Sequence, residues 1–157
     1  MLMQNLISPA QVASMAFAPL DRVTPEDVNQ LTISVAQQRF VSPVLGDAMV
    51  EAMIGGSYSE LVEELIAPAL ALYTRVLMMP SLALRTGAAG VVKGSSDYLD
   101  AATENDLRSL RRTTLAQATT LLRKAVSQIE SSPELYPEYD PRQNIWRRCR
   151  IDGGVVA

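Results

Sequence analysis

Three kinds of residue in this chain could take part in chemistry: clustered carboxylates, a single thiol and a pair of glycines. Glu60, Glu63 and Glu64 could supply the paired carboxylates of general acid–base catalysis. Cys149 stands between two arginines, whose positive charges would lower the pKa of its thiol and favour a nucleophile. Gly87 and Gly90 could line a loop that holds a ligand. Each interpretation has a structural alternative.

The structural alternative is favoured in each case. The three glutamates fall in the first turn of a predicted helix, where the helix dipole favours negative charge. Cys149 has no histidine to accept its proton, because the chain contains none. The two glycines suit a turn between short strands. None of the three groups therefore defines an active site.

Missing residue types exclude most catalytic classes. The 157-residue chain has no histidine and one cysteine, which removes Ser-His-Asp and Cys-His catalysis, intramolecular disulfides and CxxC zinc sites. It also lacks glycine-rich phosphate-binding motifs, the GxSxG motif of hydrolases and acidic calcium-binding loops. We therefore expect a protein that is not an enzyme, with no cofactor and no metal site.

Length and composition predict one soluble globular domain. Hydrophobic residues make up 48% of the chain, charged residues 20%, and the net charge is −3. The N-terminus does not resemble a signal peptide, and the longest apolar run, Leu65–Tyr73, is far shorter than the roughly 20 residues that span a bilayer. A lone cysteine fits a reducing compartment, or a virion assembled in one. We expect synthesis in the cytoplasm.

Capping signals predict two helices near the N-terminus. Ser8–Gln11 is a capping box with proline in the first turn, and it predicts a helix from Pro9 to about Phe17. Thr24-Pro25 repeats this pattern and predicts a second helix from Pro25 to about Phe40. Ser42-Pro43 should break that helix, because proline disfavours helical geometry in the residue before it.

A wide apolar stripe predicts a central helix in the middle of the chain. A short helix over Asp47–Ile54 should precede it, and Ser57–Glu60 has the pattern of a capping box that begins it. Pro68 falls inside the stripe and should kink the helix near Glu64 without dividing it in two. Pro80 should mark its end.

After the central helix, the sequence pattern changes from helical to β-compatible. Leu82–Lys93 is compatible with a β-hairpin or with an extended loop. Thr103 should cap the longest helix, whose apolar residues repeat with a period near 3.6 as far as Ile129. We predict a mostly α bundle of four to five helices in residues 1–133, and an extended C-terminal arm in residues 134–157.

The charges are divided unevenly along the chain. Residues 1–104 carry 5 basic and 11 acidic side chains, whereas residues 105–157 carry 9 basic and 6 acidic ones. Such segregation could support docking between copies of the chain or to a partner. The arginines around Trp146 could instead bind nucleic acid, or the charges could simply be solvated.

The order of segments resembles one known family. The resemblance rests on QRFVSPVLGD (residues 38–47), IAPALALY (66–73) and GVVKGSS (90–96), followed by the helix Thr103–Gln128. Together these stretches are similar to the small head-to-tail connector proteins of tailed bacteriophages, especially those that infect Bacteroidetes. The resemblance covers about residues 24–130.

The resemblance implies a structural virion protein without catalytic residues. Such connectors form an oligomeric ring, typically of twelve copies, between the portal protein and the tail or neck proteins, and the ring extends the channel through which DNA passes. An acidic N-terminal portion is compatible with a channel that does not grip phosphates. The segment Leu82–Ser95 would be a projecting loop, and the arm would reach the portal or a neighbouring subunit.

The predicted interface residues follow from this comparison and from the aromatic and basic character of the tail. They are Arg85, Lys93, Tyr136, Tyr139, Trp146, Arg147, Arg148 and Arg150. An alternative function is that of a small helical regulatory module that binds nucleic acid through its Arg-rich C-terminal segment. Salt-sensitive DNA binding would favour this alternative.

Overall fold

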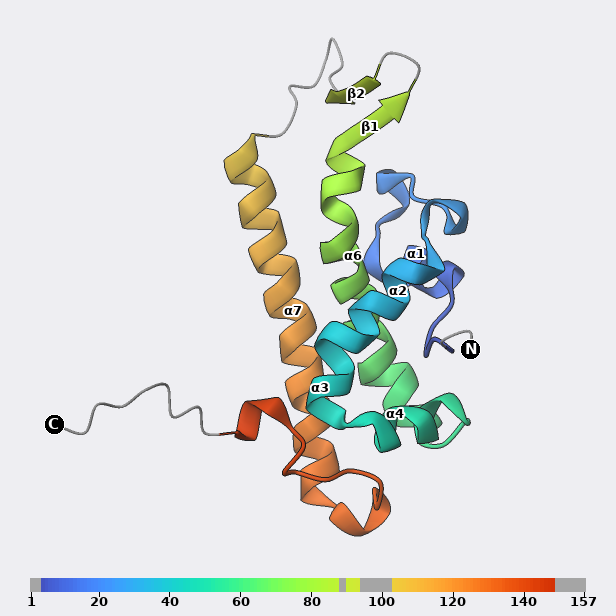
Figure 1. The fold of residues 1–157 in the computed structure, drawn as a ribbon, viewed down its shortest axis with the longest axis vertical. Helices are drawn as coiled ribbons and strands as arrows, with labels where there is room; N and C mark the ends of the chain where they lie inside the picture. The colour runs from blue at the N-terminus through green and yellow to red at the C-terminus, as the bar shows by residue number, and fades with distance from the viewer. Residues whose placement is uncertain (1–3, 88–89, 94–102, 149–157) are drawn as a thin grey trace, which may run out of the picture.

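A computed structural model describes residues 4–87, 90–93 and 103–148 of the chain (Figure 1). Two π-helical turns continue longer helices, and four single 3₁₀ turns connect elements. The helices and strands are α1 (Pro9–Ala16), α2 (Gln30–Ala36), π turn η3 (Gln37–Val41), α3 (Ser42–Leu45), α4 (Asp47–Ile54), α5 (Ser59–Leu61), π turn η4 (Val62–Ile66), α6 (Ala67–Ala83), β1 (Leu84–Gly87), β2 (Gly90–Lys93) and α7 (Glu104–Ser131). The 3₁₀ turns are η1 (Pro19–Asp21), η2 (Pro25–Asp27), η5 (Pro133–Leu135) and η6 (Ile145–Arg147).

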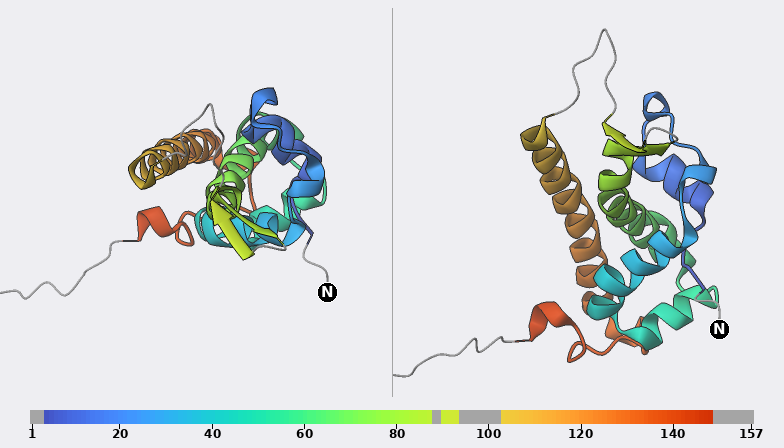
Figure 2. Two further views of the ribbon diagram at one scale, coloured as in Figure 1. Left: turned by 90° about the horizontal axis from the view of Figure 1, so that it is seen from above. Right: turned by 45° about the horizontal axis from the view of Figure 1, so that its top comes forward.

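One central helix organises the bundle. It runs without interruption over Ser59–Ala83, through α5, the π turn η4 and α6. The long helix α7 packs along one side of it, and α1 and α2 pack on the other (Figures 1 and 2). The mostly α fold class predicted from the sequence is confirmed.

The first predicted helix is confirmed as α1. Ser8 caps it with a reciprocal box: the Ser8 amide donates to Gln11 Oε1 at 2.9 Å, and the Gln11 amide donates to Ser8 Oγ at 3.3 Å. Val12 and Ala16 are buried on its inner face. The helix ends at Ala16, because Phe17 adopts an extended conformation before Pro19.

The helix predicted from Pro25 to Phe40 is wrong in its first part. Thr24 and Asp27 close only a single 3₁₀ turn, in which the Thr24 amide donates to Asp27 Oδ2 at 2.8 Å. Val28 is extended, and Asn29 caps α2 by accepting from the Leu31 amide at 2.8 Å. A second capping residue five positions downstream therefore displaced the helix start that the Thr-Pro pattern indicated.

Ser42-Pro43 does not end its helix, contrary to prediction. A π turn, η3, precedes the proline, and the Ser42 amide bonds to the Gln37 carbonyl five residues back. The central helix repeats this arrangement, since η4 precedes Pro68 and the Ala67 amide bonds to the Val62 carbonyl. The wider turn redirects the carbonyls that a proline ring would otherwise meet. The central helix stays in one piece, as predicted, and a π turn that includes Glu64 stands where the kink was expected.

Two other helix ends differ from prediction. Pro80 does not end the central helix, which continues to Ala83. The capping box expected at Ser57–Glu60 does not form, because Tyr58 stands at the N-cap position with φ of 61° and its side chain makes no capping bond. The short helix Asp47–Ile54 is confirmed as α4, and the Gly55-Gly56 pair follows it.

The excursion after the central helix is a hairpin, one of the two predicted alternatives. Strands β1 and β2 are antiparallel, with Leu84 opposite Lys93 and Arg85 opposite Val92. β1 follows α6 directly, and the hairpin stands at one end of the bundle (Figure 1). The predicted interface residues Arg85 and Lys93 therefore lie on neighbouring strands at that end.

The core lies where α6 meets α7 and the N-terminal helices. Its largest fully buried side chains include Ile33, Leu45, Ile66, Leu70 and Leu122. Small residues let the helices approach closely: Ala69 and Ala71 of α6, and Ala118 and Ala125 of α7, are each 0% exposed. This burial of an apolar stripe supplies most of the stability of such a bundle.

By length and composition alone, one helix among the described residues, the central helix Ser59–Ala83, is long and apolar enough to cross a membrane. In its most apolar stretch of 18 residues, 56% is buried inside the structure. Core helices of globular proteins pass the same test, and here the apolar surface faces α1, α2 and α7.

Gly46 gives the first testable prediction. It links α3 to α4 with φ of 84° and ψ of 152°, a region that essentially only glycine adopts, and an added Cβ would lie 2.7 Å from Gln143 Oε1. Gly46→Ala should therefore lower the free energy of unfolding by about 1–3 kcal/mol, measured by urea denaturation. Gly55→Ala is the matched control, since Gly55 has φ of −69°; an equal loss in both variants would contradict the explanation.

Candidate interaction surfaces

The described part of the C-terminal segment, residues 132–148, lies against the bundle (Figure 1). Tyr136 and Tyr139 pack partly buried against the core, and the ring centroid of Tyr136 is 4.9 Å from that of Tyr58. The extended arm predicted from residue 134 is corrected for residues 134–148: aromatic side chains and single turns hold the segment in place without a helical period. Residues 149–157 lie outside the described part of the chain.

Residues 132–148 are called the docked segment below. A hydrogen-bond network holds this docked segment against the end of α7. Tyr139 Oη donates to Glu130 Oε1 at 2.8 Å, and Asn144 Nδ2 donates to Tyr139 Oη at 2.9 Å. Asn144 is 1% exposed and also accepts from the Trp146 amide. Burial raises the pKa of Tyr139, which keeps its hydroxyl protonated and able to donate.

One tail arginine, Arg147, and the tryptophan make contacts within the chain. Arg147 pairs with Glu130, and this hydrogen bond raises the pKa of Arg147. The guanidinium of Arg123 lies 5.3 Å from the ring centroid of Trp146, which remains 39% exposed. These contacts occupy two of the groups that the nucleic-acid alternative would need, while Arg150 lies outside the described residues.

A second tyrosine ties the docked segment to the start of the central helix. Tyr58 donates to the Glu138 carboxylate, and this hydrogen bond raises the pKa of Tyr58 to about 12. Two segments that are 80 residues apart in the sequence are therefore joined at this point. Sequence patterns did not indicate the roles of Glu138, Gln143 or Asn144.

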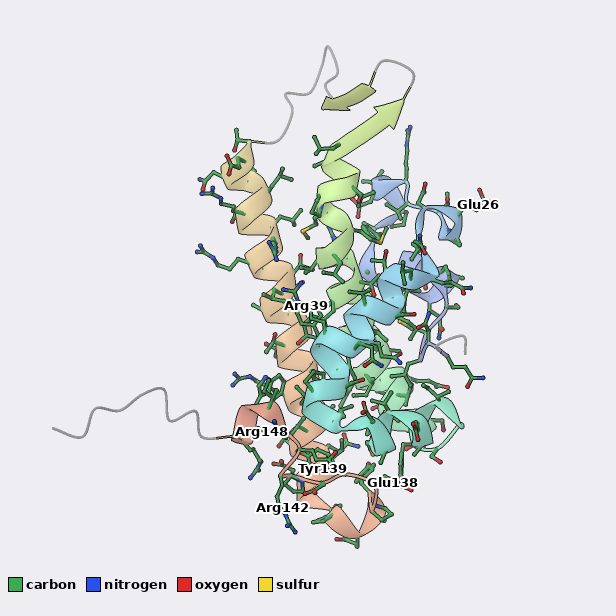
Figure 3. All side chains as sticks on the ribbon, viewed as in Figure 1. Glu26, Arg39, Glu138, Tyr139, Arg142 and Arg148 are labelled. Carbon is green, nitrogen blue, oxygen red and sulfur yellow. The ribbon has the colours of Figure 1, made fainter. Side chains whose placement is uncertain are left out.

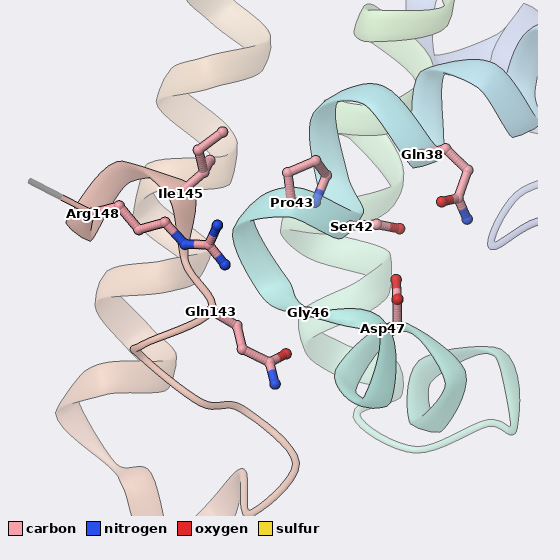
Figure 4. Close-up of a pocket in the computed structure, with 8 residues that line it drawn as sticks. All are labelled: Gln38, Ser42, Pro43, Gly46, Asp47, Gln143, Ile145 and Arg148. Atoms are coloured by element: carbon pink, nitrogen blue, oxygen red, sulfur yellow. The ribbon is translucent and has the colours of Figure 1, made fainter. Parts of the chain in front are cut away.

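A recess separates the α3–α4 turn from the docked segment (Figure 4). It has a volume of about 440 Å³ and contains Arg148 and Gln143 on one side and Gln38, Ser42 and Asp47 on the other. The Ser42 hydroxyl is buried and has no hydrogen-bond partner in the described structure. The recess is polar, and its charged groups are of opposite sign, so it favours neither an anion nor a cation.

The uneven charge of the sequence is only partly a separation in space. Residues 4–84 carry three basic and eight acidic side chains, and residues 103–148 carry eight basic and six acidic ones. Glu26 lies at the upper right of the view in Figure 3, and Arg148 and Arg142 lie in its lower part together with Glu138. Asp47 lines the same recess as Arg148, and Asp140 lies 3.8 Å from Arg142. The two parts of the described chain therefore differ in net charge, but acidic side chains also lie among the basic ones.

An apolar cleft opens between the end of α6 and the beginning of α7. It has a volume of about 600 Å³, and its apolar residues are Met79, Pro80, Ala83, Leu84 and Leu107. Arg108 and Arg111 of α7 stand at its edge together with Glu104, which pairs with Arg108 at 2.5 Å. The cleft lies next to the hairpin, at the end of the bundle far from the docked segment (Figure 1).

The carboxylates that the sequence offered for acid–base catalysis do not form an enclosed site. Glu60, Glu63 and Glu64 are exposed at the start of the central helix. Among the described residues, no three acidic or cysteine side chains gather in a way that could hold a metal ion. Of the predicted interface residues, the structure brings together Tyr136, Tyr139, Trp146, Arg147 and Arg148, and it places Arg85 and Lys93 at the other end.

The described structure is that of a small helical bundle with a hairpin at one end and a docked C-terminal segment at the other. The chain belongs to a family of unknown function, DUF6712, whose model matches residues 34–148. The matched span includes the central helix, the hairpin, α7 and the docked segment. No curated protein and no solved structure matches the chain.

Proposed function

We propose that this protein is a structural subunit of a bacteriophage virion, a head-to-tail connector that forms a ring between the portal and the tail. Copies of the chain, twelve in the ring that the resemblance implies, would surround the channel through which DNA leaves the head. The ring would contact the portal protein on one side and tail or neck proteins on the other. DNA would pass through without sequence-specific binding.

The observation that best supports this proposal is the difference in net charge between two parts of the described chain. A ring requires heterologous contacts, in which one surface of a subunit meets a different surface of the next. Residues 4–84, which include Glu26, are acidic on balance, and α7 with the docked segment is basic on balance, so surfaces of the two parts could attract each other between copies. Electrostatic complementarity of this kind sets the register of contact.

The expected result is self-association of the purified protein that weakens as salt is added. Native mass spectrometry and light scattering would show closed oligomers, alone or with the portal protein present. Raising the ionic strength shortens the Debye length from about 10 Å at 0.1 M to about 3 Å at 1 M, so the charged faces should attract each other less. A monomer at high protein concentration that also ignores the portal would contradict the proposal.

A further inference from the structure

Leu20 is the most exposed large apolar side chain among the described residues, with 92% of its surface accessible. It lies in the 3₁₀ turn η1, between Pro19 and Asp21. This turn is held firmly, because the Ala18 amide donates to Asp21 Oδ2 at 2.8 Å and the Asp21 amide donates to the Ala18 carbonyl at 2.9 Å. Leu20 therefore points outward from a turn that two hydrogen bonds close, and Leu20 with this turn is called the projection below.

The apolar cleft described above lies on the other side of α6. Leu82 borders a hollow shared with Asp21 and Arg22, Met79 and Ala83 border the cleft beside α7, and Leu84, the first residue of β1, borders both. Both features stand at the hairpin end of the bundle (Figures 1 and 2). One copy therefore carries an apolar projection and an apolar cleft at the same end, built from different residues.

The charges around the projection and the cleft are complementary. Asp21, Glu26 and Asp27 accompany Leu20, with Arg22 as the one basic residue of that stretch. Arg108 and Arg111 line the cleft, with Glu104 as its acidic residue. The projection is acidic on balance and the cleft is basic on balance.

We propose that Leu20 of one copy inserts into the cleft between α6 and α7 of the next copy. This contact rests on the proposed ring, and it names the surfaces that would build it. Because the projection and the cleft are different surfaces, each copy can engage two neighbours in a head-to-tail manner, which closes a ring when the rotation permits. Asp21 would then approach Arg108 and Arg111 of the neighbour.

The test uses one variant for each surface. Leu20→Arg places a positive charge toward Arg108 and Arg111, and Leu107→Glu places a negative charge toward Asp21. Each variant should weaken self-association at least about tenfold, since burying a leucine contributes that much or more. Leu20 is exposed, and an acidic residue is favourable near the beginning of α7, so circular dichroism should show an unchanged fold.

The controls are exposed residues outside the contact. Leu135→Arg adds the same charge at a leucine that is 61% exposed, at the other end of α7. Asn105→Glu adds a carboxylate to the first turn of α7 at a residue that does not line the cleft. Both controls should associate like the unmodified protein in analytical ultracentrifugation.

A mixing experiment distinguishes this contact from other arrangements. The Leu20→Arg variant retains an intact cleft, and the Leu107→Glu variant retains an intact projection, so an equimolar mixture should regain association, at least as heterodimers. Association of the two variants at the level of the unmodified protein would overturn this contact and leave the ring standing. No recovery in the mixture would also overturn it. Absence of association in the unmodified protein, with or without portal, would overturn both proposals.

Discussion

Removal of residues 134–157 is expected to lower the free energy of unfolding by at least about 3 kcal/mol. The truncation removes two partly buried tyrosines, the buried Asn144 and the hydrogen bonds that join them to Glu130. It also leaves Tyr58 without the ring of Tyr136 and without Glu138. Urea denaturation followed by circular dichroism would measure the loss, because it reports both the fold and its stability.

A shorter truncation is the control. Removal of residues 149–157 keeps every contact described for residues 132–148, so this variant should retain the stability that those contacts supply and should be more stable than the longer truncation. If the longer truncation were as stable as the full chain, the segment would be a separate arm as the sequence suggested, and the packing described here would be contradicted.

Leu122→Ala is the second large effect that we expect. Leu122 is 0% exposed on α7 and lies on the side that packs against α6. Its truncation removes buried apolar surface and leaves a cavity, which costs about 2–5 kcal/mol in a core that cannot collapse around it. The small alanines that already line this contact, Ala118 and Ala125, leave little material nearby to fill the space.

The neighbouring Leu121→Ala variant provides the comparison. Leu121 has the same chemistry and helix position but is only partly buried, so its loss should be about half as large or less. The ratio of the two losses, measured by urea denaturation, checks which face of α7 meets the bundle. Equal losses would mean that α7 is rotated relative to the structure described here.

Much of the fold could be predicted where a local signal decides the outcome. The capping box at Ser8, the cap at Thr103, the short helix Asp47–Ile54 and the period of α7 all depend on residues within a few positions of one another. The Thr103 hydroxyl and the Thr103 amide both donate to Asp106 Oδ2, at 2.7 Å and 3.0 Å, and these hydrogen bonds lower the pKa of the Asp106 carboxyl. Local chemistry and tertiary structure agree at these places.

Prediction failed where a contact outside the segment or an unusual turn decided the outcome. Ser42-Pro43 looked like a helix end, yet a π turn precedes Pro43 and the helix continues. Pro80 also looked like a helix end, yet α6 accommodates it in its last turn and ends at Ala83. The tail lacks a helical period because its order comes from Tyr58, 80 residues before Glu138, and from Glu130 in the preceding helix. No pattern within residues 134–148 could reveal those partners.

The sequence indicated one of the candidate surfaces and not the other. The aromatic and basic character of residues 136–148 marked a contact region, and the structure shows that much of this contact is internal. The sequence around Leu20 does not predict its role, because an isolated leucine beside a proline can be either buried or exposed. Its exposure becomes visible only when α1 and η2 are placed around the central helix.

The two π turns have a consequence for the spacing of residues along this chain. A π turn accommodates one residue more than an α-helical turn, and the helix beyond it keeps the face that an uninterrupted helix would have presented. Elsewhere in the same helix, one added residue would rotate everything downstream by about 100°. Gln37–Val41 and Val62–Ile66 are therefore the places where the helices can lose a single residue while Leu45, Leu70 and the rest of the core stay in phase.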